Sequence, residues 1–569
     1  MAMRFVLILG LLFGGFVSTN APSAAPAGTP ALGDLSKVGS VRFPTTCDPT
    51  VQKEFERGLA LLHSFFYEEA RRVFTSVAEK DPQCAIAQWG IAMSYWHPIW
   101  TPPDSSELAA GRAAVTRALA ASKKDEREGA YVKAIQAYYE GLAEPVVAVP
   151  GSGAPAADQS CHGPRLVDPK GRAACFLREM EQVVRHNPDD TDASAFLALA
   201  LLGTAPPGDP ALANQKRAAG ILERWYAEQP GHPGLAHYLI HSYDYPPLAA
   251  QGLKAANAYA AMQPWVPHAL HMPSHIYTRL GMWAENVAAN QASAEAARAY
   301  AASHHPDAAS FEELHALDYL MYGHLQAGQD REAKQVLGRL GEIRKTHPET
   351  DFVVGYAFGA MPARYALERR QWKEAAALAV LPMPFWGRLP FAEGHIVYAR
   401  AIGAAKTGDL VAAGAAADRL QELAGSVKDA RFRYFADQMG LQRQAALGLI
   451  ALARGGKDEA IGILRQAAAK EDSLGKHPVS PGAILPIREL LGEALIDCGR
   501  PAEALAEYEA SLAIYPRRFN GVAGAARAAA AAGKTEVARR YYGELIALSK
   551  GGDRVRPEVK TAAEYLARR

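Results

Sequence analysis

Residues 485–518 read LPIRELLGEALIDCGRPAEALAEYEASLAIYPRR, and the positions of glycine and proline in this segment indicate a pair of helices. Alanine, the strongest helix former, is abundant here and throughout the chain, so helices are expected in both halves of the stretch. A glycine between the halves predicts a turn, and a proline near the end predicts where the second helix stops. The residues that carry this pattern are Leu491, Gly492, Gly499, Ala504, Tyr508 and Pro516.

The same pattern recurs with a period of about 34 residues. It is found in residues 519–552 and, at the other end of the chain, in residues 51–84. Each unit would leave apolar surface that a neighbouring unit must cover, so the units are predicted to stack. The matching residues are Ala526, Gly533, Ala538 and Tyr542 in the first of these units and Gly58, Ala70, Phe74 and Pro82 in the second.

These residues resemble the tetratricopeptide repeat (TPR), a helix–turn–helix unit with small residues where its helices cross. The resemblance is strong at both ends of residues 45–550 and weaker in the middle. It implies an all-α solenoid of about twelve helix pairs. We expect TPR-like repeats over residues 45–230, a central histidine-rich set over 231–430, and C-terminal repeats with a cap over 431–569. A Gly/Pro/Ala-rich insertion at 144–170 is predicted to be a surface loop.

The N-terminus has the pattern of a secretory signal peptide. Arg4 precedes an apolar run at residues 5–17, and small residues follow up to Ala21. The run is too short to span a membrane, so residues 1–21 are predicted to be cleaved. Residues 22–44 then form a flexible leader. The mature protein is expected in the periplasm or outside the cell.

Five cysteines are compatible with an oxidising compartment. We predict disulfides between Cys47 and Cys84 and between Cys161 and Cys175, with Cys498 left as a small helix residue. Five free buried thiols are the alternative. Lys plus Arg numbers 61 against 60 Asp plus Glu, which gives no electrostatic case for nucleic acid or an anionic membrane surface. No second long apolar run predicts a membrane span.

Five of the seventeen histidines lie within residues 237–275. His237 and His241 are four residues apart, which places both imidazoles on one face of a helix. His268, His271 and His275 form a second stripe if their segment is helical. Pro273 interrupts this stripe: either the helix kinks there, or it begins there and leaves His268 and His271 in the approach to it.

The TPR register places these histidines in the concave groove. Positions 2, 5, 9, 12 and 13 of a first helix line the groove in that family. Counting from Pro233, Pro267 and Leu314, those positions hold the five histidines together with Asp244, His315 and Asp318. His395 falls at such a position in a later unit, whereas His63 and His97 stand alone in theirs and are interpreted as packing residues.

Two functional interpretations follow. In the first, His237, His241, His271 and His275 bind zinc or copper, and His268, His315, Asp244 or Asp318 complete or orient the shell. An open coordination position would allow metal-assisted chemistry on a small ligand. In the second, the groove is a non-catalytic scaffold for a peptide or protein partner. The sequence contains no His-Glu-x-x-His, Walker or dinucleotide motif that would point to another chemistry.

Overall fold

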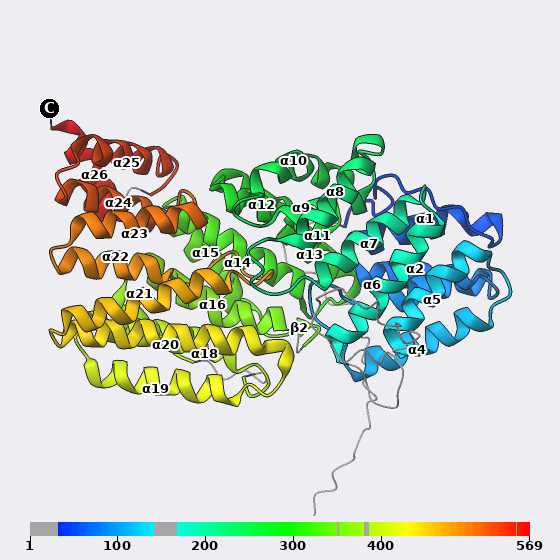
Figure 1. Cartoon of the computed structure of the whole chain (residues 1–569), viewed down its shortest axis with the longest axis horizontal. Helices are drawn as coiled ribbons and strands as arrows, with labels where there is room; N and C mark the ends of the chain where they lie inside the picture. Colours follow the sequence, from blue (N-terminus) through cyan, green and yellow to red (C-terminus); the bar gives the residue numbers. More distant parts are fainter. Residues whose placement is uncertain (1–31, 141–167, 350–351, 381–385, 554, 569) are drawn as a thin grey trace, which may run out of the picture.

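The computed structural model describes residues 32–140, 168–349, 352–380, 386–553 and 555–568. The predicted signal peptide and most of the insertion at 144–170 lie outside these residues. Within them the chain is a succession of antiparallel helices that stack side by side (Figure 1). The all-α solenoid predicted from the 34-residue period is therefore confirmed.

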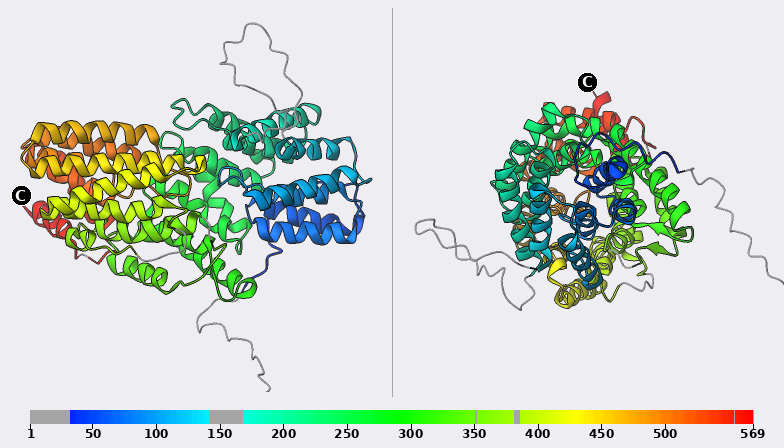
Figure 2. Two further views of the ribbon diagram at one scale, coloured as in Figure 1. Left: turned by 90° about the horizontal axis from the view of Figure 1, so that it is seen from below. Right: turned by 90° about the vertical axis from the view of Figure 1, so that its right-hand side faces the viewer.

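The first half of the solenoid runs from the N-terminus to the long helix α13. Seen along the long axis of the molecule, its helices are arranged around a ring (Figure 2). Its helices are α1 Gln52–His63, α2 Tyr67–Lys80, α3 Ala85–Met93, α4 Ser105–Ala120, α5 Glu126–Glu140, α6 Pro169–His186, α7 Thr191–Gly203, α8 Ala213–Glu228, α9 Pro233–Tyr243, α10 Leu253–Met262, α11 Pro267–His271, α12 Pro273–Leu280 and α13 Trp283–His304, with short 3-10 turns η1 Pro49–Val51 and η2 Ala249–Gly252.

The second half continues the stack to the C-terminus. A two-residue parallel pairing between β1 Ala309–Ser310 and β2 Thr346–His347 lies where it begins. Its helices are α14 Phe311–Gln326, α15 Asp330–Glu342, α16 Phe352–Glu368, α17 Trp372–Ala376, α18 Pro390–Thr407, α19 Leu410–Ser426, α20 Arg433–Ala453, α21 Lys457–Leu474, α22 Ile487–Asp497, α23 Pro501–Ile514, α24 Phe519–Ala531, α25 Thr535–Leu548 and α26 Pro557–Ala567, with η3 Ala430–Phe432.

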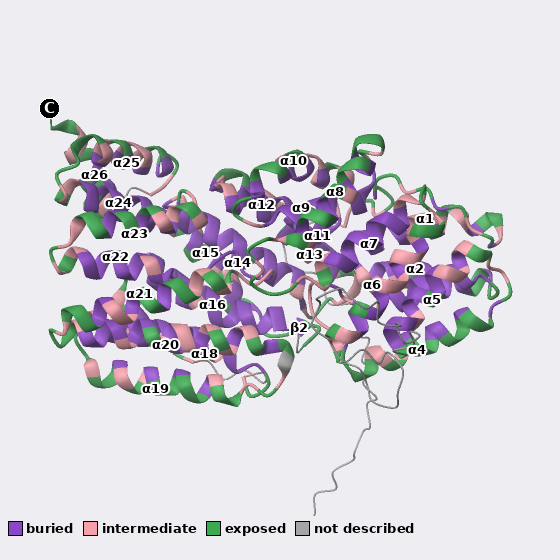
Figure 3. Ribbon diagram, viewed as in Figure 1, coloured by how far each residue is buried: buried purple, intermediate pink, exposed green. Residues whose placement is uncertain are grey.

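Buried apolar side chains form two main clusters, one drawn from residues 38–300 and one from residues 283–562. Burial is concentrated on the faces that neighbouring helices share (Figure 3). The crossings are close where small residues occur. A Cβ atom added to Gly359 would lie 2.1 Å from the carbonyl oxygen of Ala392, so α16 and α18 meet backbone to backbone. Among the described helices, none is long and apolar enough to cross a membrane.

Left-handed residues make the turns between paired helices. Six of these turns use glycine, which adopts positive φ without steric cost: Gly281, Gly328, Gly408, Gly455, Gly499 and Gly533. The turn between α1 and α2 instead contains Phe65 at φ 55°, and the turn between α16 and α17 contains Arg370 at φ 54°. A residue with a side chain costs roughly 1–2 kcal/mol in this conformation. Phe65 is therefore held against a local strain that glycine would relieve.

One connection runs along the inner face of the second half. Residues 475–486 join α21 to α22 without helical structure, and we call them the inner segment. Tyr319 on α14 donates a hydrogen bond to the carbonyl of Ser480 (3.0 Å), and Arg364 on α16 donates to the carbonyl of Ala483 (3.0 Å). Val479 in this segment is buried. The chain thus fills part of its own groove.

The predicted flexible leader is corrected in its second half. The backbone N–H of Ser40 donates to the carbonyl of Gly231 (2.9 Å), and Phe43 is fully buried against Phe55 and Trp89. Apolar burial of Phe43 is enough to fix a segment whose composition alone suggests a linker. The fold therefore begins before residue 45.

The structure confirms the disulfide between Cys47 and Cys84, whose Cα atoms lie 4.9 Å apart. Cys498 is free and half-buried, as expected. The predicted partner of Cys175, Cys161, lies outside the described residues, so that pairing stays a prediction.

We expect Cys47→Ser with Cys84→Ser to lower the free energy of unfolding of the N-terminal repeats by about 3–4 kcal/mol, because the bond closes a loop of 37 residues. Denaturant unfolding followed by circular dichroism measures this change. Cys498→Ser is the matched control and should shift the midpoint little. Equal midpoints for the double variant and the wild type would contradict the prediction.

Candidate metal centre

Six buried histidines converge where the two halves of the solenoid meet. They are carried by α9, α11, α12 and α14, whose starts are fixed by prolines or a serine cap: Pro233, Pro267, Pro273 and Ser310. Each imidazole is at least nine-tenths buried. The six are His237, His241, His268, His271, His275 and His315.

The proline within the histidine stripe opens a new helix. Pro273 is the first residue of α12, and His268 and His271 lie on the short helix α11 before it. The second of the two alternatives raised by the sequence is the one observed. Because α11 and α12 are separate, His268 turns toward α9, whereas His271 pairs with His275.

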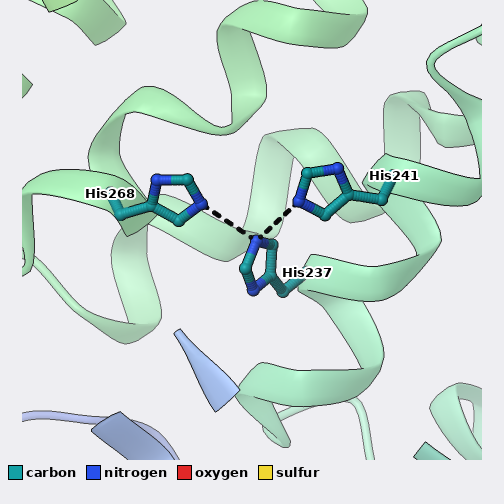
Figure 4. Close-up of side chains that lie close together, drawn as sticks. All are labelled: His237, His241 and His268. Carbon is teal, nitrogen blue, oxygen red and sulfur yellow. Dashed lines mark hydrogen bonds between the residues drawn. The ribbon is translucent and has the colours of Figure 1, made fainter. Parts of the chain in front are cut away.

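His237, His241 and His268 form the first group, which we call the N-terminal trio (Figure 4). The Nε2 atoms of His241 and His268 lie 3.1 and 3.2 Å from the Nε2 atom of His237. The Nδ1 atom of His237 lies 2.6 Å from the carbonyl oxygen of His63. A carbonyl can only accept, so Nδ1 carries the proton and Nε2 presents a lone pair.

This lone pair faces two nitrogens at once. Nε2 of His237 has one lone pair and can accept one well-directed hydrogen bond, not two. Three imidazole nitrogens around a tetrahedral zinc ion at about 2.05 Å would lie about 3.3 Å apart. The measured separations of 3.1 and 3.2 Å are close to that value. Two of the three nitrogen separations in the N-terminal trio are therefore close to those of a three-imidazole metal site, and all three nitrogens lie within 4.8 Å of one another.

His271, His275 and His315 form the second group, the C-terminal trio. The Nδ1–H of His271 donates to Oδ1 of Asn290 (2.6 Å), and the Nδ1–H of His275 donates to Oδ2 of Asp244 (2.9 Å). The Asn290 amide is oriented by its own Nδ2, which donates to the carbonyl of Asn286 (2.8 Å). Both histidines are thus held in the tautomer with a bare Nε2.

The two bare nitrogens face each other. Nε2 of His271 and Nε2 of His275 are 3.0 Å apart, and Nε2 of His315 is buried and has no hydrogen-bond partner among the described residues. Burial lowers the pKa of His271 well below its usual range and also lowers the pKa of His275, so a bridging proton is disfavoured near neutral pH. Lone pairs so placed repel one another unless a cation lies between them.

The predicted carboxylates have different roles. Asp244 accepts from His275, from Nε of Arg279 (2.9 Å) and from Nζ of Lys476 (2.7 Å), so it orients a histidine and is saturated with donors. Those cations hold its pKa well below the usual range, against the effect of burial. Asp318 lies against Arg364, at 3.5 Å from Nε, and belongs to neither trio. Of the predicted site residues, the structure brings together the six histidines with Asp244 behind them.

The two trios are adjacent. The ring centroids of His241 and His275 are 6.0 Å apart, and those of His268 and His271 are 6.1 Å apart. Within the N-terminal trio, the rings of His241 and His268 are 6.5 Å apart. Spacing between the trios therefore falls within the range found inside one, and the six rings form a continuous cluster.

A cavity of about 750 Å³ adjoins this cluster. His268 is the histidine of the two trios that lines it, beside Phe65 and Trp100. Its walls come from both halves of the solenoid and include the buried carboxyl of Glu312. Burial and the charge of Glu68 raise the pKa of Glu312 to about 8. The cavity has the size usual for small-molecule sites.

Several functional neighbours gave no signal in the sequence. Asn290 contacts His271 from α13, 19 residues later in the chain, and Lys476 contacts Asp244 from the inner segment, 232 residues later. His63 and His232 share one oxygen of Asp192 (2.8 and 3.2 Å), and His63 is thereby fixed as the residue whose carbonyl orients His237. His232, which directly precedes α9, is buried.

The fold defines this chain as a TPR-like helical-repeat protein with a histidine-lined interior. No family model matches it, and none of the curated proteins matches. Similar solved structures include the Cut9–Hcn1 hetero-tetramer of the APC/C (10% identity over 91% of this chain and 90% of that one, TM-score 0.32). Yeast Tom70 (11%, 86% and 96%, TM-score 0.31) and IFIT1 with m7Gppp-AAAA (11%, 82% and 90%, TM-score 0.35) are others.

His395, a candidate for the groove, lies apart from both trios. Its ring contacts Tyr356 and Phe391, and neither ring nitrogen has a hydrogen-bond partner within the described part of the chain. Burial, helped by the charge of Arg364, lowers the pKa of His395 to about 3. Between about pH 3 and pH 6.5, His395 is therefore neutral in the folded protein, whereas it is protonated in the unfolded chain.

We expect His395→Leu to reduce the loss of stability in acid. The unfolded chain binds a proton at His395 below about pH 6.5, while the folded protein takes it up near pH 3, so His395 lowers stability as pH falls through this window. Its removal should reduce the slope of unfolding free energy against pH by about 1.4 kcal/mol per pH unit between pH 6 and 4. Urea unfolding at several pH values measures the slope, and parallel curves for variant and wild type would refute the prediction.

Proposed function

We propose that this protein binds metal ions in its interior, one in each histidine trio. The observation that carries the proposal is the C-terminal trio, where His271 and His275 present bare Nε2 atoms 3.0 Å apart. Their Nδ1 atoms are committed to Asn290 and Asp244, an arrangement typical of histidines that bind metals. His315 supplies a third ring nitrogen, and the three ligand atoms lie within 4.8 Å of one another.

The donor set favours zinc or copper. All six proposed ligands are imidazoles, which suit these metals better than magnesium or calcium. Three protein ligands leave one coordination position for water or for a small ligand, as in catalytic zinc sites. The cavity beside His268 gives such a ligand a place next to the N-terminal trio. Metal-assisted chemistry on a small molecule is the activity that this arrangement supports.

The wild type should therefore bind two ions per chain after purification without an affinity tag and reconstitution with zinc or copper. The double variant His237→Ala/His241→Ala should bind one ion, in the C-terminal trio. The double variant His271→Ala/His275→Ala should also bind one ion, in the N-terminal trio. His395→Leu, which changes a buried histidine outside both trios, is the control and should bind two. Inductively coupled plasma mass spectrometry measures the content.

A single substitution tests the role of Asn290 in orienting His271. Asn290→Ala removes the acceptor of His271 and should weaken the C-terminal site by about 10- to 100-fold while leaving the N-terminal site unchanged. Failure of the wild type to take up either metal on titration would refute the proposal. Equal loss of metal in the control variant would show that the fold, and not the ligands, had been disturbed.

The alternative is a scaffold that binds a peptide or protein in its groove. TPR-like architecture favours this role in general, because a solenoid offers a long concave surface. In this chain the inner segment already occupies that surface beside α14 and α16, where Tyr319 and Arg364 bind its carbonyls. A partner would have to displace it. The metal function is therefore the better supported of the two.

We also propose that the protein is exported and loses its signal peptide. The apolar run at residues 5–17 and the disulfide between Cys47 and Cys84 both suit an oxidising compartment. The exported protein should begin near residue 22, in soluble form. N-terminal sequencing and intact mass of the exported protein measure this, and retention of Met1 in a membrane fraction would contradict it.

A further inference from the structure

Phe65 occupies a turn position that six other helix pairs give to glycine. Its ring is nevertheless buried, and it contacts every member of the N-terminal trio. Its centroid lies 4.4 Å from that of His237, 5.7 Å from that of His241 and 5.4 Å from that of His268. Because backbone strain persists where the surrounding structure imposes it, this position points to a function for the ring.

A second strained turn places a second aromatic ring against His268. Ile99 has φ 71°, unusual for a β-branched residue, and Trp100 follows it. The edge of Trp100 meets His268 at a centroid distance of 5.5 Å and His315 at 5.1 Å. Trp100 thus touches one histidine of each trio. Phe65 and Trp100 both line the cavity beside His268.

We propose that the cavity binds a hydroxy-aromatic small molecule, a phenol, whose ring packs between Phe65 and Trp100 with its oxygen toward the ion of the N-terminal trio. This inference rests on the proposed metal function. Aromatic walls favour a planar ring through offset or edge-to-face contact. The metal requires a donor atom on that ring, and oxygen ligands bind zinc and copper alongside imidazole.

Charge in the cavity favours a neutral hydroxyl over a carboxylate. Glu68 and Glu312 both line it, and the raised pKa of Glu312, near 8, shows that a further negative charge there would be disfavoured. Two of the basic side chains of the lining are engaged: Arg71 donates to the carbonyl of Ser94 (3.2 Å), and Arg431 pairs with Asp429 (2.6 Å). An aromatic acid would bring its carboxylate to a place where burial and Glu68 already disfavour the charge of Glu312.

Three probes with the same ring separate these contributions. Toluene has the ring alone, p-cresol adds the hydroxyl, and 4-methylbenzoate adds a carboxylate. Isothermal titration calorimetry on the metal-loaded full-length protein should give one p-cresol site per chain and at least tenfold weaker binding of the other two. Equal affinities for p-cresol and toluene on the loaded protein would overturn the assignment of the oxygen to the metal.

Variants then test the walls. Phe65→Leu and, separately, Trp100→Leu should each weaken p-cresol binding by about tenfold while the metal content stays at the wild-type value. Phe432→Leu is the matched control, because Phe432 lines the same cavity but packs on Phe352 and Phe391, away from His268. Unchanged p-cresol affinity in both Phe65→Leu and Trp100→Leu would refute the proposal. If one of the two variants does not fold, unchanged affinity in the other would refute it.

The experiment also distinguishes a failure of the metal proposal from a failure of this one. If the protein takes up no metal, the proposed function fails, and p-cresol should bind no better than toluene. If metal binds in both trios but p-cresol does not, only the cavity assignment fails. Tighter binding of the peptide Gly-Tyr-Gly than of p-cresol would overturn the small-molecule assignment in favour of a peptide ligand.

Discussion

A neutral imidazole carries a single proton, and the interior of this protein depends on where that proton lies. In His237, His271 and His275 the proton is on Nδ1. These N–H groups donate to the carbonyl of His63, the amide oxygen of Asn290 and the carboxylate of Asp244, respectively. The Nε2 atoms of His271 and His275 then face each other as acceptors, and Nε2 of His237 faces the nitrogens of His241 and His268. In water such acceptors would be satisfied by solvent, but at nine-tenths burial they are not. The geometry of both trios follows from this one constraint.

The solenoid supplies the means to build such a cluster. Each helix pair is held by its neighbours, so a polar group in the interior need not be supported by the helix that carries it. α9, α11, α12 and α14 contribute six imidazoles because consecutive pairs turn the same face inward. The apolar clusters on either side provide the stability that a buried polar group reduces.

Much of the fold could be read from the sequence, because the repeat is local. Gly499 and Tyr508 predict a helix hairpin without reference to the rest of the chain, and the structure places Tyr508 against Gly492 and Gly524 as a close crossing requires. His237 and His241 were placed on one face by helical spacing alone. The division into trios could not be predicted, because it depends on the break at Pro273 and on the angle between α9 and α11.

Other parts of the site lie beyond any local pattern. Asp318 follows His315 by one helical turn and was expected beside it. Its carboxylate instead lies against Arg364 of another helix. Asn290 reaches His271 from the neighbouring helix α13, whereas Lys476 comes from a segment 232 residues after Asp244. Composition misled for residues 38–43 as well, since the burial of Val38 and Phe43 outweighs the linker-like sequence around them.

The salt bridge between Lys476 and Asp244 also sets an order of assembly. Asp244 orients His275 with the help of a lysine that lies 232 residues later in the chain. While the polypeptide emerges from the ribosome, all six imidazoles are synthesised well before that lysine appears, and N-terminal units can fold first. Until the inner segment arrives, the carboxylate lacks its lysine partner and the C-terminal trio is incompletely braced. Bracing of the C-terminal trio is therefore delayed until residue 476 has been synthesised, and a product truncated before it would lack this brace even with all six imidazoles present.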